Sequence, residues 1–143
     1  MLVRLMYASR AAAAVDADAL GAILRQSKEN NARSGVTGVL CFCSNAGIFL
    51  QVLEGARDAV SAVYNRIAQD TRHAAVVLLS YEEIGERSFA SWSMGQVNMN
   101  RLNPSLVLKY SESAVLDPYA VSGKASLALF NELVATASIG TQA

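Results

Sequence analysis

The chain has 143 residues, of which 52% are hydrophobic and 17% charged, a composition typical of a folded globular domain and unlike that of a disordered chain. Its 12 Lys and Arg residues balance 12 Asp and Glu residues, which argues against electrostatic binding to nucleic acid or to an anionic membrane. Charged residues interrupt every apolar stretch before it reaches the roughly 20 residues that span a bilayer. The first residues do not resemble a signal peptide. We therefore expect a protein of the cytoplasm with no membrane segment.

The hydrophobic pattern predicts seven elements in the order βαββαββ. Predicted strands repeat their apolar residues every second position, and predicted helices every third or fourth. The strands cover residues 2–9, 36–43, 48–54, 74–81 and 94–97. The helices run from Asp16 or Asp18 to Asn30 and Asn31, and from Val60 to about Thr71. This order fits an α+β fold of the ferredoxin-like type, an antiparallel or mixed sheet with two helices on one face.

The sequence after residue 98 predicts a helical extension. Its apolar residues follow helical spacing: Leu106, Val107, Tyr110, Leu127, Phe130, Leu133 and Val134. The strand at 48–54 is apolar on both faces, so both faces of the sheet need cover. We expect a core over residues 1–98 and an extension over 99–143 that covers the second face or pairs with another copy of the chain.

Gln51 is an amide on a strand that is otherwise apolar, so its side chain needs a partner inside the fold. A buried amide without one costs about 1–3 kcal/mol. Tyr7 lies on the predicted first strand, and a neighbouring strand brings its hydroxyl within reach of Gln51. A tyrosine–glutamine pair that locks the core, and a pair that serves a bound ligand, both fit this pattern.

Two other groups of polar residues are open to more than one interpretation. The doublet Asn30-Asn31 suits the end of a helix, but one cap needs one asparagine, which leaves the other amide free to recognise a planar ligand. At the end of the second predicted helix stand Arg66, Asp70, Arg72 and His73. They form either a solvated charged face or a contact for phosphate and ribityl groups.

Signals for catalysis and for metal binding are weak. His73 is the single histidine, and neither a nucleophile elbow nor a phosphate-binding glycine loop occurs in the sequence. One histidine makes a zinc site implausible, and Cys41 and Cys43 suit a role as reduced, buried thiols. We therefore expect a protein that binds without substrate turnover and holds no metal.

Taken together, separated motifs in residues 1–98 resemble the BLUF domain, a flavin-binding sensor of blue light with a ferredoxin-like fold. The motifs are Tyr7-Ala8-Ser9, Asn30-Asn31-Ala32-Arg33, Phe49-Leu50-Gln51-Val52-Leu53-Glu54-Gly55, Asp70-Thr71-Arg72-His73 and Phe89-Ala90-Ser91-Trp92-Ser93-Met94. The resemblance implies a flavin held between the two helices, usually FAD, with FMN or riboflavin as alternatives. It places the flavin contacts at Ser9, Asn30, Asn31, Gln51, Arg66, Asp70, Arg72 and His73.

The resemblance also implies a mechanism and an output. Tyr7 would give an electron and a proton to the excited flavin, and Gln51 would rearrange its hydrogen bonds to give a red-shifted signalling state. Trp92 and Met94 would relay the signal, although which of them faces the flavin stays open. The extension would pass it on through self-association or to a separate protein partner.

Two alternatives belong to other classes of function. A small acylphosphatase-like hydrolase shares the fold class and would use Arg10 and Asn31, but it leaves Tyr7 and Gln51 without a purpose. A ligand-free interaction module would dimerise through its terminal helices. A yellow colour with a light-dependent flavin spectrum separates the sensor from both.

Overall fold

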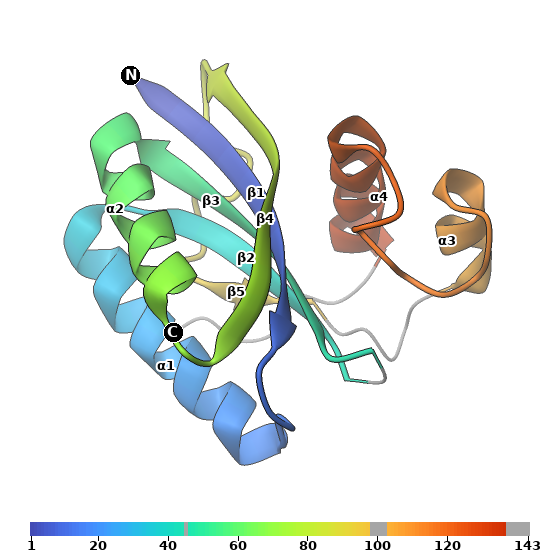
Figure 1. The fold of residues 1–143 in the computed structure, drawn as a ribbon. Helices are drawn as coiled ribbons and strands as arrows, with labels where there is room; N and C mark the ends of the chain where they lie inside the picture. Colours follow the sequence, from blue (N-terminus) through green and yellow to red (C-terminus); the bar gives the residue numbers. More distant parts are fainter. Residues whose placement is uncertain (45, 98–102, 137–143) are drawn as a thin grey trace.

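The computed structural model describes residues 1–44, 46–97 and 103–136, and their elements follow the order βαββαββαα (Figure 1). The elements are β1 (Leu2–Ala11), α1 (Ala17–Ser34), β2 (Thr37–Cys43), β3 (Ile48–Ala56), α2 (Arg57–Gln69), β4 (His73–Ile84), β5 (Gly95–Gln96), α3 (Pro104–Tyr110) and α4 (Gly123–Thr136). The expected boundary between residues 98 and 99 lies outside the described residues, as do the side chains of Leu133 and Val134.

The sheet has the strand order β4-β1-β3-β2-β5. β1 pairs with β3 and β4, and β2 with β3, all antiparallel, whereas β5 runs parallel to β2. β1 and β3 are therefore central strands with neighbours on both sides. The structure confirms the expected α+β fold with a mixed sheet.

The end of α1 differs from the sequence prediction. Asp16 caps the start of the helix by accepting a hydrogen bond from the N–H of Ala19 at 2.8 Å. The helix does not end at Asn30 and Asn31 but continues to Ser34, and Gly35 follows with a φ of 71°. Glycine adopts this left-handed conformation without strain, so the helix ends there and both asparagines lie within its last turns.

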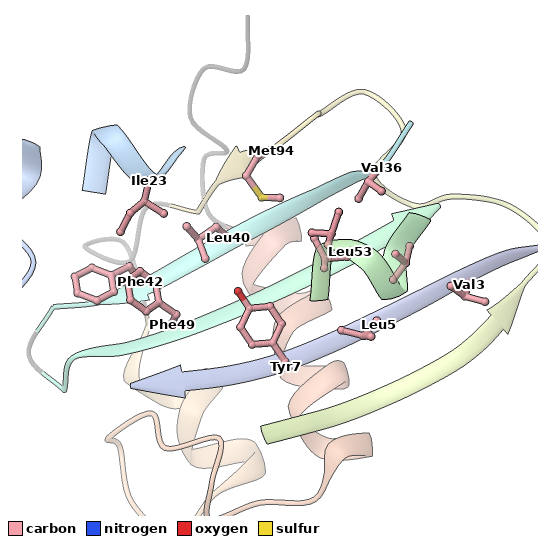
Figure 2. Packing of buried hydrophobic residues seen from close by; sticks show 12 residues of the cluster. Val3, Leu5, Tyr7, Ile23, Val36, Leu40, Phe42, Phe49, Leu53 and Met94 are labelled. Atoms are coloured by element: carbon pink, nitrogen blue, oxygen red, sulfur yellow. The ribbon is translucent and has the colours of Figure 1, made fainter. Parts of the chain in front are cut away.

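Helices cover both faces of the sheet, as the two apolar faces of β3 predict (Figure 1). We call the side of α1 and α2 the cleft side and the side of α3 and α4 the tail side. The buried core on the cleft side includes Tyr7, Leu40, Phe49, Leu53 and Met94 (Figure 2). The buried core on the tail side includes Met6, Leu50, Phe89, Leu129 and Phe130. Because successive side chains of a strand point to opposite faces of the sheet, one strand contributes residues to both cores.

Among the described residues, no helix combines the length and the apolar character that crossing a bilayer demands.

Candidate functional site

A cleft of about 670 Å3, including its open mouth, lies on the cleft side between α1, α2 and the sheet. Sites for small organic ligands are concave and mostly apolar with a few well-placed polar groups, and this cleft is lined in that way. Its apolar walls come from Ile23, Leu40, Phe49, Val63 and Ile67. Its polar lining comes from Tyr7, Gln26, Ser27, Asn30, Asn31, Gln51, Arg66, Asp70, Arg72 and His73.

Tyr7 and Gln51 stand directly opposite each other on β1 and β3, and the Tyr7 hydroxyl donates a hydrogen bond to Oε1 of Gln51. Both side chains are almost fully buried, with exposed fractions of 1% and 3%. Burial, with smaller effects of Tyr64 and Asp70, raises the pKa of Tyr7 far above its usual value. The phenol is therefore neutral and held in one orientation by the amide, which confirms the pairing expected from the sequence.

Met94, just before β5, completes the surroundings of the amide. Nε2 of Gln51 lies 3.2 Å from the thioether sulfur of Met94, which is fully buried in the cleft-side core. Trp92, two residues earlier, packs instead against the tail-side core. Of the two residues that the sequence nominates as a relay, Met94 thus faces Gln51.

The two asparagines of α1 both line the cleft but differ in their surroundings. Asn31 is 2% exposed, and its Nδ2 donates a hydrogen bond to the backbone oxygen of Ser93 at 2.8 Å. This bond ties α1 to the segment that leads to Met94. Asn30 is half-buried. The amide of Asn31 keeps further donor and acceptor capacity for a ligand.

Charged groups gather at one end of the cleft. Arg72 forms an ion pair with Asp70 at 2.5 Å and donates a second bond to Oε1 of Gln26 at 2.9 Å. The hydrogen bond from Arg72 lowers the pKa of Asp70, so this carboxylate is ionised. Arg66 lies in the cleft lining from α2. Two guanidinium groups in one lining provide strong donors for anionic groups.

His73 and Ser9 connect this charged end to the floor of the cleft. Oγ of the fully buried Ser9 lies at a hydrogen-bond distance of 2.7 Å from Nδ1 of His73. The imidazole packs on the Phe49 ring at 4.8 Å and meets the Tyr7 ring edge-on at 6.4 Å. Burial lowers the pKa of His73, which favours the neutral ring. Ser9 is absent from the cleft lining and acts on it through His73.

The sequence interpretation missed two kinds of residue. Gln26 and Ser27 line the cleft from α1, and the helical spacing of Ile23, Ser27 and Asn31 was the signal that would have found them. The second is Glu54, a fully buried carboxylate in β3, three residues after Gln51.

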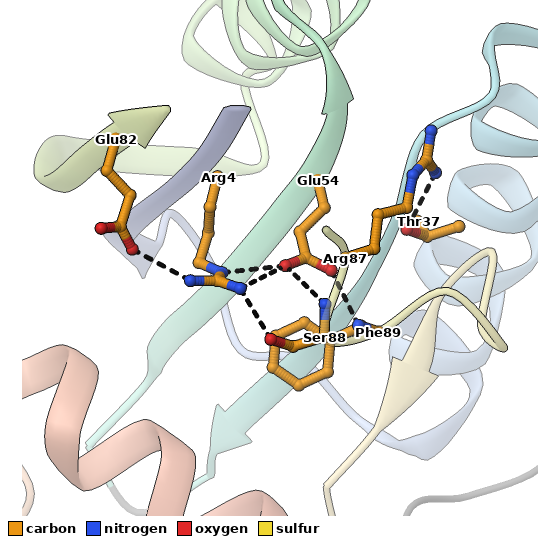
Figure 3. Close-up of polar contacts among 7 residues, drawn as sticks. All are labelled: Arg4, Thr37, Glu54, Glu82, Arg87, Ser88 and Phe89. Atoms are coloured by element: carbon orange, nitrogen blue, oxygen red, sulfur yellow. Dashed lines mark hydrogen bonds and ion pairs between the residues drawn. The ribbon is translucent and has the colours of Figure 1, made fainter. Parts of the chain in front are cut away.

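Glu54 anchors the chain between β4 and β5 (Figure 3). It accepts hydrogen bonds from Nε of Arg4 at 2.8 Å and from the backbone N–H groups of Ser88 and Phe89 at 3.0 and 2.7 Å. Arg4 also bonds Glu82 at 3.0 Å. The buried charge is thereby compensated, and the segment that carries Met94 is fixed to the strand that carries Gln51.

The arrangement suits a flat aromatic ligand with polar edges. Apolar side chains would cover the two faces of such a ring, and the amides of Asn31 and Gln51 would bond its edge. The residues nominated for an acylphosphatase-like site do not come together. Arg10 lies 4.5 Å over the ring of Tyr119, a residue of the tail-side core, whereas Asn31 lines the cleft on the opposite face. The hydrolase alternative therefore finds no support.

Comparisons with known proteins agree with this geometry. The family model described as BLUF, sensors of blue-light using FAD, matches residues 2–95. The photoactivated adenylate cyclase subunit beta of Euglena gracilis is 37% identical over 94 residues, and the alpha subunit of the same organism is 39% identical over 90 residues. These matches cover 65% and 63% of this chain but 11% and 9% of the relatives, so the chain spans only a small part of their length.

Solved structures extend the likeness beyond residue 95. BlsA in its photo-activated state matches with a TM-score of 0.79 and 30% identity, over 96% of this chain and 99% of that one. The dark state of BlrB, a BLUF protein, matches with a TM-score of 0.76 and 30% identity, over 94% and 95% of the two chains. With its tyrosine and glutamine hydrogen-bonded in the floor of the cleft, the chain belongs to the BLUF family of blue-light flavin sensors.

Proposed function

We propose that the cleft binds FAD and that Tyr7 and Gln51 are its photoactive residues. The observation that carries the proposal is the buried hydrogen bond between the Tyr7 hydroxyl and the Gln51 amide, at the floor of a cleft with apolar walls. The family description supports a flavin, and the two arginines of the lining support one that carries phosphates.

The residues of the lining divide into three groups by chemistry. The amides of Asn30, Asn31 and Gln51 would bond the polar edge of the flavin ring. Arg66 and Arg72 would bond its phosphates, Arg72 through Nη1, since its Nε and Nη2 bond Asp70 and Gln26. His73 and Asp70, at the same end of the cleft, would bond the ribityl chain, and Ser9 would hold His73 in place.

When bound, the flavin would supply light absorption and an electron acceptor. Tyr7 is the donor in this proposal. Because burial raises its pKa, a bare tyrosinate is unfavourable there, so Tyr7 would not lose its proton before its electron. Gln51 holds that proton in its hydrogen bond, and the other end of its amide is held by the weak sulfur acceptor of Met94. The Nε2 end of the amide can thus change partners at small cost.

The chain itself acts as a sensor without substrate turnover, and its output leaves through the helices after β5. These helices pack on the tail side, behind the strands that carry Tyr7 and Gln51. We propose that light changes how this surface associates with a second copy or with a separate protein partner. The location in the cytoplasm expected from the sequence stays a prediction.

The test is a light-minus-dark absorption spectrum of the full chain purified with its ligand, followed by identification of the released ligand by mass. We expect a flavin spectrum that shifts to the red under blue light and returns in darkness, and FAD as the released species. A protein that takes up no flavin, or one whose bound flavin shows no reversible shift, contradicts the proposal. FMN or riboflavin as the main species contradicts the assignment of FAD alone.

A further inference from the structure

The pairing of β1 with β4 contains two bulges that the binding of a ligand in the cleft does not explain. The register of this antiparallel pair shifts twice. The first shift leaves Leu79 of β4 without a partner in the ladder. The second sets Ala75 and Val76 of β4 against Ser9 alone. At a bulge the extra residue frees backbone groups from the ladder and turns them toward other partners.

The chain after α3 docks on β4 at both bulges. The Tyr119 hydroxyl donates a hydrogen bond to the backbone oxygen of Ala75 at 2.7 Å. Gly123, the first residue of α4, packs so closely on Leu79 that a Cβ there would lie 1.6 Å from the Leu79 backbone oxygen. Only glycine fits at this contact, because the obstacle is a backbone atom and not a flexible side chain.

The docked arrangement also contains two unfavourable features. Ala75 has a φ of 50°, a left-handed conformation that is costly for a residue with a Cβ. The hydroxyl of Ser126, in the first turn of α4, is buried and makes no hydrogen bond within the described part of the chain. Undocking α4 would give this hydroxyl access to water. The contact is therefore specific in shape, and these two features lower the cost of releasing it.

The second bulge lies between the cleft and the docked segment. Ser9 bonds His73 on the cleft side. Arg10, the next residue of β1, faces the tail side, where its guanidinium lies 4.5 Å over the Tyr119 ring. On β4, His73 precedes Ala75 by only two residues. A shift of the bulge thus moves a contact of the cleft and a contact of the tail together.

We propose that residues 117–126 form a latch, which holds the terminal helices on β4 and is released when the bulge at Ser9 shifts. Arg10 and Tyr119 are the positioning residues of this latch. It forms a second connection between the cleft and the tail, separate from the route through Met94. Its existence does not require a ligand, whereas its control by the cleft rests on the proposed function.

Hydrogen–deuterium exchange of the full chain without added flavin tests the latch. Gly123→Ala places a Cβ against the Leu79 backbone, so we expect amides of α4 to exchange at least about fivefold faster. Gly85→Ala is the matched control, because a Cβ at Gly85 meets nothing within 4 Å. Ser126→Ala removes the unbonded hydroxyl and should slow the exchange of α4.

Tyr119→Phe covers the case in which Gly123→Ala fails to fold. It removes one hydrogen bond, and we expect α4 to exchange about fivefold faster while the amides of β2 and β3 keep their rates. Unchanged exchange of α4 in the folded variants, or equal acceleration throughout the chain, overturns the latch.

Coupling to the cleft is measured in two ways. Ser9→Ala should alter the rate of amide exchange in α4, although the Ser9 hydroxyl bonds His73 on the cleft side. Conversely, Tyr119→Phe should change the affinity for FAD, because coupling between two sites is reciprocal. Failure of the unmodified chain to bind FAD refutes the proposed function and leaves the exchange result to judge the latch. No response of α4 to Ser9→Ala refutes the coupling.

Discussion

Gln51 and Met94 are joined by a hydrogen bond between unequal partners: an amide N–H lies 3.2 Å from a thioether sulfur. The sulfur is a weak acceptor, whereas the phenol that bonds the other end of the amide is a good donor. The amide is thus held firmly by β1 and loosely by the segment before β5. When Gln51 rearranges, its contact with Met94 is therefore the one that breaks at lower cost.

Replacing Met94 with leucine tests this relationship. The volume is nearly kept, but Nε2 of Gln51 loses its acceptor, so we expect the free energy of unfolding to fall by about 1 kcal/mol and the rate of dark recovery to change. Urea denaturation and flash spectroscopy measure the two effects. Trp92→Phe, on the tail-side core, is the control and should keep the rate of dark recovery. A rate of dark recovery that depends on Trp92 and not on Met94 contradicts this assignment.

Tyr7→Phe should leave flavin bound and abolish the stable red shift, since the hydroxyl that bonds Gln51 is removed. The unbonded amide oxygen should also lower the free energy of unfolding by about 1–3 kcal/mol. Tyr64→Phe is a close control, because the Tyr64 ring lies 5.7 Å from the Tyr7 ring without taking part in its hydrogen bond to Gln51. A normal photocycle in Tyr7→Phe would refute the role of Tyr7 as donor.

Glu54→Ala should be strongly destabilising. Arg4, with a side chain 16% exposed, would lose its buried partner, and the N–H groups of Ser88 and Phe89 would lose their acceptor. We expect a loss of about 3–5 kcal/mol in urea unfolding. Glu83→Ala, which breaks the exposed ion pair with Arg57, should cost less than about 1 kcal/mol. Similar losses in the two variants would show that Glu54 is no anchor.

His73 predicts a pH dependence of stability in the flavin-free protein. Burial lowers its pKa in the folded state, so below about pH 6.5 the unfolded chain binds a proton that the folded chain does not. The free energy of unfolding should therefore fall as the pH drops from 7.5 to 5.5. His73→Gln should flatten this slope, and since His73 is the single histidine, no other imidazole contributes. An equal slope in the variant would exclude His73 as the cause.

The two arginines of the cleft distinguish the forms of flavin. Arg66→Gln and Arg72→Gln should each weaken binding of FAD by about tenfold, since each removes a charged hydrogen-bond donor to phosphate, and should leave riboflavin binding nearly unchanged. Titration by fluorescence quenching gives both affinities. Arg33→Gln, an exposed position of α1 outside the cleft lining, is the control. Equal weakening for both flavins would mean that the arginines do not bind phosphate.

Patterns that depend on neighbours in the sequence were reliable predictors. The period of two predicted the strands, and the apolar residues on both faces of β3 predicted cover on both sides of the sheet. Gln51 stood out because an amide in an apolar strand needs a partner, and the register of β1 and β3 supplies Tyr7. The end of α1 was predicted wrongly, because asparagine tolerates a helix end but glycine at position 35 does so at lower cost.

The sequence by itself determined the order of elements, the family motifs and the need of Gln51 for a buried partner, since these follow from local periodicity and from the cost of an unpaired amide. Only the tertiary structure decided that Met94 and not Trp92 faces that amide, that Glu54 anchors the segment before β5, and that Tyr119 reaches Ala75. Each of these contacts joins residues far apart in the chain. Their distances depend on strand register, bulges and helix docking, which no local pattern encodes.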